Sequence, residues 1–258
     1  MTPRRLALTG IAALKRAADP KVAARSRTFF KPHERIRLYG VPAPRLKAIE
    51  RDLWRIVEGE WSPEEAVEFA DILVRRPHLE CKGLGLLLLF RFRKRFEPDL
   101  LARARSWLAG NHCANWAATD SLCAFVLSPL LHDHLDLIPE IRTWASSKNL
   151  WVRRASAVAM VPLARRGESL DAAYEIAGSL LGDREDLIHK ATGWLLRECG
   201  KTDGGRLEAF LLRHGPRVPR TTLRYAIERI PARRRKEILE ATRPTAPKRA
   251  TRRPGGSG

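Results

Sequence analysis

From His78 onward the chain repeats one pattern, in which a short polar turn precedes an apolar segment long enough for a helix. Trp116 and Trp151 open two such segments 35 residues apart, and His189 opens another 38 residues after Trp151. Partner segments fall between them, at residues 98–108, 135–145 and 170–181. A helix pair of this kind buries its apolar face by stacking on the next pair, so the spacing predicts a curved all-α array.

The period is that of a solenoid of HEAT-like antiparallel helix pairs, although it is somewhat shorter than usual. The apolar segments are rich in leucine rather than in β-branched residues, so no strand is expected. We expect one repeat domain over residues 1–242 and a basic, disordered tail over residues 243–258. Helices are expected at residues 5–18, 20–31, 45–57, 62–75, 82–96, 115–127, 150–165, 189–198, 204–212, 221–230 and 232–241, besides the three partner segments.

Local signals mark several of these boundaries. Ser62 is followed by Pro63 and, three residues on, by Glu65, which is the pattern of a capping box at a helix start. An Asp-Pro pair at residues 19 and 20 closes the first helix. The stretch YGVPAP, Tyr39–Pro44, is expected to be extended because a proline disfavours helical conformation in the residue before it.

The charge balance indicates a polyanionic partner. The formal net charge is +19, in a chain with 44% hydrophobic residues, and nucleic acid is the commonest polyanion. An acidic membrane surface is the alternative, but no segment has eighteen uncharged apolar residues, so no membrane partner is expected. We expect a monomer in the bacterial cytoplasm, associated with the nucleoid when it acts. The N-terminal run MTPRRLALTGIAALKR is then an amphipathic first helix and not a signal peptide.

No cofactor is expected. The histidines and cysteines between residues 112 and 134 lack the paired spacing of a zinc site, so we expect no metal. The sequence has no glycine-rich phosphate loop and no nucleotide fingerprint, so we expect no nucleotide cofactor. The wide separation of the cysteines in a chain of this size indicates reduced thiols. The four cysteines are Cys81, Cys113, Cys123 and Cys199.

The segment NHCANWAATD, at residues 111–120, is the most informative candidate site. Asp120 follows Trp116 by four residues, which places an indole and a carboxylate on one helical face. An indole face attracts positive charge and a carboxylate neutralises it, so the pair suits a cationic guest. Two simpler interpretations remain open. Trp116 and Trp194 can be packing residues, and Asp120 can cap a helix or pair with a nearby arginine.

A basic groove is expected beside this segment. Six basic residues and no acidic residue lie between Arg142 and Arg166. If Arg153 and Arg154 face the concave side of the array, a phosphate backbone can lie along it. The short helix starts at Trp116 and Trp151 would add free backbone N–H groups.

Four ordered segments resemble the DNA alkylation repair family, the AlkD-like HEAT-repeat alkylpurine DNA glycosylases. YGVPAP is similar to an early turn of that family, and NWAATDSL resembles its tryptophan-x-x-x-aspartate helix. KNLWVRRASAV and HKATGWLLRECGK resemble two later helices, and the similarity covers roughly residues 8–230. Asn115 and Ala117 flank Trp116 where the best-known members have a second tryptophan and a second aspartate, so this motif lacks one aromatic wall.

The resemblance implies a duplex bound in the concave face and hydrolysis of the N-glycosidic bond of cationic N3- or N7-alkylated purines. Trp116 and Trp194 would then be the aromatic pair at the lesion, Asp120 the catalytic carboxylate, and Arg154 a ligand of the DNA backbone. The other residues expected at the DNA are Arg153, Lys148, Trp151, Lys190, Arg197 and Tyr39. Alternatively, Trp151 is a packing residue, and Arg153 and Arg197 are simply exposed to solvent.

Two functions follow from the sequence. The first is a monofunctional glycosylase, which needs Trp116, Asp120 and Trp194 together. The alternative is a non-catalytic HEAT-repeat protein that binds distorted or branched DNA, for which charge and fold suffice. A protein-interaction scaffold ranks third because that role leaves the charge of +19 unexplained.

Overall fold

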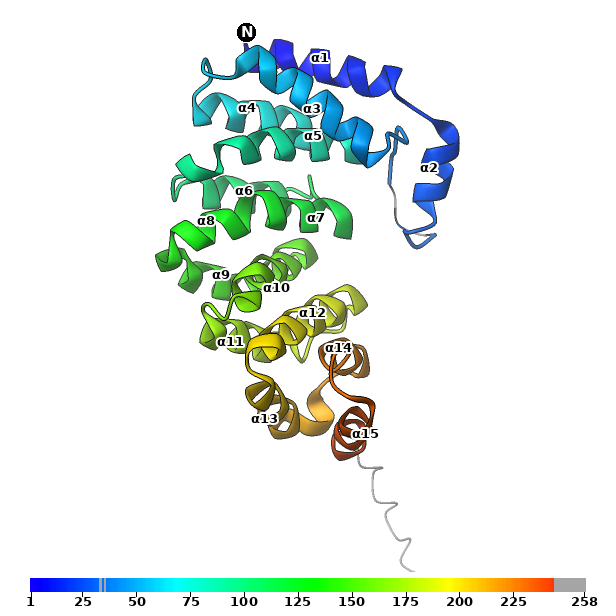
Figure 1. Cartoon of the computed structure of the whole chain (residues 1–258), viewed down its shortest axis with the longest axis vertical. Coiled ribbons are helices and arrows are strands. Elements are labelled where there is room, and N and C mark those ends of the chain that lie inside the picture. The colour runs from blue at the N-terminus through cyan, green and yellow to red at the C-terminus, as the bar shows by residue number, and fades with distance from the viewer. Residues whose placement is uncertain (33, 35, 244–258) are drawn as a thin grey trace, which may run out of the picture.

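The structure is a computed structural model that describes residues 1–32, 34 and 36–243. Within these residues all regular secondary structure is helical, the helices are joined by loops and turns, and there is no strand but only one isolated bridge between Arg37 and His78 (Figure 1). The expected all-α class is therefore confirmed. The expectation of a disordered tail lies outside the described residues, save for Arg243.

The helices follow the repeat read from the sequence. The α-helices are α1 (Pro3–Arg16), α2 (Pro20–Arg27), α3 (Ala43–Val57), α4 (Pro63–Val74), α5 (Leu79–Leu89), α6 (Leu100–Ala109), α7 (Trp116–Leu122), α8 (Ser128–Asp133), α9 (Ile138–Trp144), α10 (Leu150–Arg165), α11 (Leu170–Leu180), α12 (Asp186–Thr202), α13 (Gly204–His214), α14 (Arg220–Ala226) and α15 (Ala232–Ala241). Shorter helical turns are η1 (Phe90–Arg95), η2 (Cys123–Leu127), η3 (Leu135–Leu137) and η4 (Gly215–Arg217).

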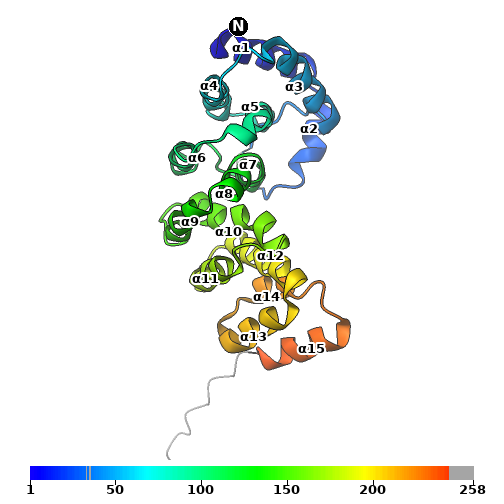
Figure 2. The same cartoon turned by 60° about the vertical axis from the view of Figure 1, so that its left-hand side comes forward.

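The helices stack into a curved solenoid of two rows. In one row, α3, α5, α7, α10, α12 and α14 each contact the next, and we call this the inner row. Helices α4, α6, α9 and α11 lie on the other side (Figures 1 and 2). Both rows bury leucine, alanine and valine between them, and the core runs the length of the array. This packing confirms the solenoid predicted from the helix spacing.

Some boundaries differ from the expected ones. The helix expected at 115–127 is instead α7, a π-helical turn η2 and α8, in unbroken succession to Asp133. Pro129 has no N–H to donate to the preceding turn, which accounts for the widened register before it. Helix α12 begins at Asp186, three residues earlier than expected, because the Asp183 carboxylate accepts the N–H of Glu185 at 2.9 Å and sets the turn there.

Asparagine side chains place two tryptophans in the first turn of a helix. The Asn115 Oδ1 accepts the N–H of Ala118 at 2.8 Å, and the Asn149 Oδ1 accepts that of Trp151 at 2.8 Å. Each bond satisfies a backbone donor that the helix leaves free. The capping box of Ser62 and Glu65 is also present, as predicted.

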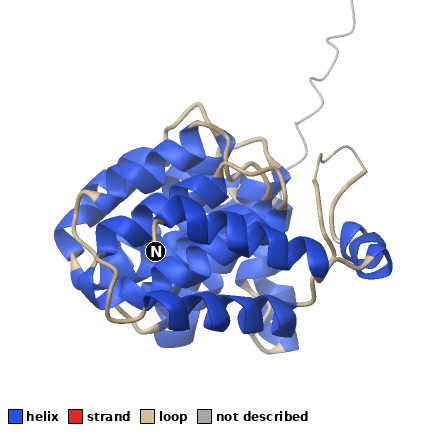
Figure 3. Ribbon diagram, turned by 90° about the horizontal axis from the view of Figure 1, so that it is seen from above, coloured by secondary structure: helices blue, strands red, loops and turns tan. Residues whose placement is uncertain are grey.

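Residues 20–32, which contain α2, form an arm beside the inner row. Seen from above, the arm stands apart from the stacked helices (Figure 3). Its base is fixed at Tyr39–Val41, where the buried Glu80 carboxylate accepts the N–H groups of Tyr39, Gly40 and Val41 at 3.0, 2.7 and 3.3 Å. The last two residues of YGVPAP are not extended as predicted, because they form the first turn of α3. Gly40 has a φ of +80°, and a Cβ there would lie 2.1 Å from the Asp19 carbonyl oxygen, so only glycine fits.

Among the described residues, no single helix is both long and apolar enough to cross a bilayer. Only the bent pair Trp116–Asp133 and Leu135–Trp144, taken together, meets the criteria of length and composition.

Candidate active site on helices α7, α10 and α12

An ion pair joins three neighbouring helices of the inner row. The Arg154 guanidinium, on α10, donates Nε–H and Nη2–H to the two carboxylate oxygens of Asp120 on α7, both at 2.8 Å. Its Nη1 donates to the Leu187 carbonyl oxygen on α12 at 2.6 Å. Arg154 is buried, whereas 21% of the Asp120 side chain is exposed. The carboxylate is therefore held in a fixed orientation with one edge open to solvent.

Trp116 lies one turn before Asp120, as the four-residue spacing predicts, and it has an aromatic neighbour that the sequence did not indicate. Phe30, from the arm, stacks on its indole with ring centroids 5.2 Å apart and an interplanar angle of 25°. Phe30 is buried, whereas 70% of Phe29 is exposed. The arm thus adds an aromatic ring beside Trp116, in a motif that has no second tryptophan of its own.

Trp194 lies on α12, two turns beyond Leu187 and on the same helical face. It is half-buried, and its indole N–H is buried without a hydrogen-bond partner among the described residues. Lys190 and Arg197, at the same helical spacing, are half-buried as well, so the three side chains form one stripe along α12. The contacts of Arg154 thus connect the helix of Trp116 with the helix of Trp194.

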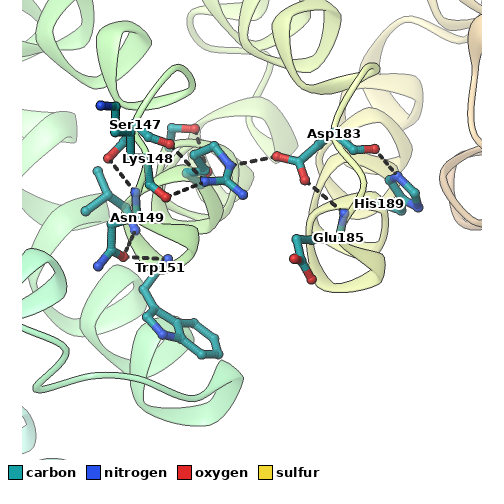
Figure 4. A network of polar contacts seen from close by, with 10 residues as sticks. Ser147, Lys148, Asn149, Trp151, Asp183, Glu185 and His189 are labelled. Carbon is teal, nitrogen blue, oxygen red and sulfur yellow. Dashed lines mark hydrogen bonds and ion pairs between the residues drawn. The ribbon is translucent and has the colours of Figure 1, made fainter.

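The other sequence-predicted arginines also have partners within the protein. The Arg153 guanidinium donates to Asp183 at 2.7 Å and to the carbonyl oxygens of Ser147 and Lys148 at 2.9 and 3.0 Å. It therefore ties the turn before α10 to the turn before α12 (Figure 4). Arg197 pairs with Glu198 and Glu228. Neither side chain is simply solvated.

The remaining residues predicted to contact DNA differ in how far their side chains are already bound within the protein. Trp151 points away from the Arg153 network and is half-buried against the core, while Lys148 is exposed (Figure 4). Lys190 pairs with Asp186 at 3.0 Å, and Lys31 of the arm reaches the same carboxylate at 3.6 Å. Tyr39 stacks on His78 with ring centroids 3.8 Å apart.

The four cysteines are free and buried. Burial raises the pKa of the Cys113 thiol to about 12 and that of Cys81 to about 11. Thiols of this kind are not nucleophiles at neutral pH. Within the described part of the chain, no group of three or more His, Cys, Asp or Glu side chains is placed to hold a metal ion.

Comparison with known proteins identifies the family. The family model described as "DNA alkylation repair enzyme" matches residues 11–230. A solved structure described as a predicted DNA alkylation repair enzyme from Enterococcus faecalis superposes with a TM-score of 0.73 and 19% identity, over 83% of this chain and 97% of that one. At this identity the structural likeness shows the fold alone, and no curated protein matches the sequence. The family match covers most of the chain, which therefore belongs to the DNA alkylation repair enzyme family.

Proposed function

We propose that this protein is a DNA glycosylase that hydrolyses the N-glycosidic bond of cationic N3- or N7-alkylated purines in duplex DNA. Family membership makes DNA the substrate. The observation that carries the proposal is the Asp120 carboxylate, which is held by Arg154 and remains open to solvent one helical turn from Trp116.

An alkylated purine needs little acid catalysis because its positive charge already makes it a good leaving group. As the bond between the base and C1′ breaks, the electron pair stays on the base and positive charge develops on the sugar. Water then adds at C1′ and loses a proton, so the products are the neutral free base and an abasic site. The enzyme has to stabilise the sugar cation and orient the water.

Asp120 suits both tasks. Arg154 uses one lone-pair direction on each carboxylate oxygen, so each oxygen has another for a water molecule or for the sugar. Arg154 acts as a positioning residue, because its three hydrogen bonds fix the carboxylate between α7, α10 and α12. The positive charge of Arg154 partly cancels the negative charge of Asp120 at a distance. The carboxylate therefore stabilises the sugar cation only when the two are in close contact.

The tryptophans would hold the cationic nucleotide. One face of the Trp116 indole is covered by Phe30, so the sugar would contact the opposite face or displace Phe30. Trp194 offers a second aromatic surface on α12. Contacts of this kind between an indole and a cation are worth up to about 2 kcal/mol when they are desolvated.

The test is release of free base from a duplex with a single N7-methylguanine. Wild-type protein should release the base, and Asp120→Asn should do so at least roughly tenfold more slowly. Asp183→Asn is the matched control, because Asp183 is also a carboxylate paired with an arginine of α10. Equal losses in both variants would indicate a general effect on the fold and would refute a catalytic role for Asp120.

The second candidate is a non-catalytic protein that binds distorted or branched DNA. The pairing of Asp120 with Arg154 and the covering of Trp116 by Phe30 both favour it. No release from the N7-methylguanine duplex or from one with N3-methyladenine, together with tight binding to a branched duplex, would support this function over excision.

A further inference from the structure

A basic cavity of about 610 Å³ lies beside Trp116, between the arm, the turn from α4 to α5 and the turn from α6 to α7. Asn115, the residue directly before Trp116, forms part of its wall. None of the residues predicted from the sequence to bind DNA lines this cavity.

The cavity is electropositive. Arg75 is neutralised by Asp71, to which it donates two hydrogen bonds of 2.8 and 3.0 Å. The other lining cations have no carboxylate partner among the described residues. They are Arg27, Arg37, Arg76 and Lys82. Against these four cations the described lining has one carboxylate, that of Glu34, so the excess is positive.

The cations divide into two that organise the cavity and two that are free. Arg27 donates to the carbonyl oxygens of Phe30, Lys31, Pro32 and Glu34, and so it shapes the end of the arm. Arg37 and Arg76, by contrast, are exposed, and no described side chain or carbonyl oxygen accepts a hydrogen bond from either guanidinium.

Lys82 is buried, although burying an ammonium group is unfavourable. Its Nζ donates to the carbonyl oxygens of Val74 and Arg76, both at 2.5 Å, which uses two of its three protons and fixes the turn that presents Arg76. Asn115 is buried too, and its Oδ1 accepts the N–H of Ala118. That bond assigns the amide orientation and leaves the two Nδ2 protons of Asn115 as donors in the cavity wall.

We propose that this cavity binds a phosphate of the DNA strand whose lesion contacts Trp116, with Arg37 and Arg76 as its charged ligands and Lys82 and Asn115 as further donors. This inference rests on the proposed function only because it assumes that the lesion lies at Trp116. A phosphodiester fits because it carries one negative charge and several acceptor oxygens, and guanidinium groups bind it with paired N–H donors. The cavity opens one residue before Trp116, where the backbone next to a contacted sugar would pass.

The test compares two double variants with the same change in net charge. Arg37→Gln/Arg76→Gln removes the free cations of the cavity. Arg95→Gln/Arg105→Gln removes two exposed arginines of η1 and α6 that lie outside the cavity and likewise have no carboxylate partner among the described residues. Affinity for an undamaged duplex is measured by fluorescence anisotropy over a series of salt concentrations. The undamaged duplex has no base to excise, so the result is independent of whether the protein is a glycosylase.

The cavity variant should bind the duplex at least roughly tenfold more weakly than the control variant. The slope of the logarithm of its association constant against the logarithm of the salt concentration should be smaller in magnitude than that of the control variant, by about 1 to 2. Equal affinities and equal slopes for the two variants would overturn the proposal. All three proteins are also titrated with inorganic phosphate by calorimetry. Phosphate binding that only the cavity variant loses, with duplex affinity unchanged, would reassign the cavity to a free phosphate ligand and would overturn the DNA assignment.

Discussion

Substitutions in the ion pair of Asp120 with Arg154 can separate the contribution of Asp120 to stability from its contribution to catalysis. Asp120→Asn leaves the guanidinium, which is 6% exposed, without an opposite charge. Its remaining acceptors are the Leu187 carbonyl oxygen and the one amide oxygen of the new asparagine. Breaking a fully buried pair costs about 3–5 kcal/mol, and the partial exposure of Asp120 reduces this to about 2–4 kcal/mol. For a chain of this length the thermal midpoint would fall by roughly 5–12 °C.

A double-mutant cycle tests this magnitude. Asp120→Asn, Arg154→Met and the double variant are unfolded in urea at 25 °C and followed by circular dichroism at 222 nm. The double variant should lose less stability than the sum of the single losses, by about 1.5–3 kcal/mol, because neither charge is then left unpaired. Single effects that add to within about 0.5 kcal/mol would refute the account of the pair.

The same double variant separates the two roles of Asp120. It lacks the carboxylate but should regain much of the fold that Asp120→Asn loses. If it still fails to release N7-methylguanine at a temperature where it is folded, whereas Arg154→Met alone still releases the base, the carboxylate is needed for the chemistry. If release returns with the fold, Asp120 is only structural.

Three further perturbations follow from the contacts described above. Gly40→Ala should destabilise the protein by about 1–3 kcal/mol and speed proteolysis at residues 17–40, because its Cβ would meet the Asp19 carbonyl oxygen; an unchanged digestion pattern would contradict this. Burial acts to raise the pKa of Glu198, but hydrogen bonds from Lys201 and Arg165 outweigh it and lower that pKa. Glu198 therefore adds stability that is present above its unfolded pKa and is lost as the pH falls through the lower folded pKa. The gap in urea midpoint between wild type and Glu198→Gln should shrink from pH 6 to pH 3, and a constant gap would exclude this linkage. Phe30→Ala should leave the helical content unchanged and increase the association rate with duplex DNA in stopped-flow measurements, whereas a slower rate would show that Phe30 contacts the DNA itself.

The array could be read from the sequence because its signals are local. Leucine-rich segments, asparagine and serine caps and the Asp-Pro pair act within a few residues, and the structure has helices where these signals occur. The boundaries that differed depend on Pro129, which widens the turn before it, and on Asp183, which starts α12 earlier. Both residues act on the backbone of a neighbouring turn, so their effects cannot be read from the spacing of apolar residues in the sequence.

The candidate site was less accessible to sequence reasoning. The four-residue spacing of Trp116 and Asp120 predicts a shared helical face, but the partner of Asp120 is 34 residues away on the next inner helix. Phe30 had only a weak signal, an aromatic pair in a polar stretch, and its stacking on Trp116 depends on how the arm returns to the inner row. Arg37 and Arg76 are brought together by the isolated bridge of Arg37 with His78 and by the buried Lys82.

The contacts of the arm have a kinetic consequence. Phe30 on Trp116 and Lys31 on Asp186 connect the end of the arm to α7 and α12, so the arm spans part of the inner row while these contacts last. The aromatic stack and the exposed ion pair together contribute about 1.5 kcal/mol, and burial of the Phe30 side chain adds roughly 1.5–3 kcal/mol. The covered face of Trp116 is then accessible in fewer than about one molecule in a hundred. A duplex that needs this face would find most molecules closed, and its capture rate would be limited by how often the arm releases.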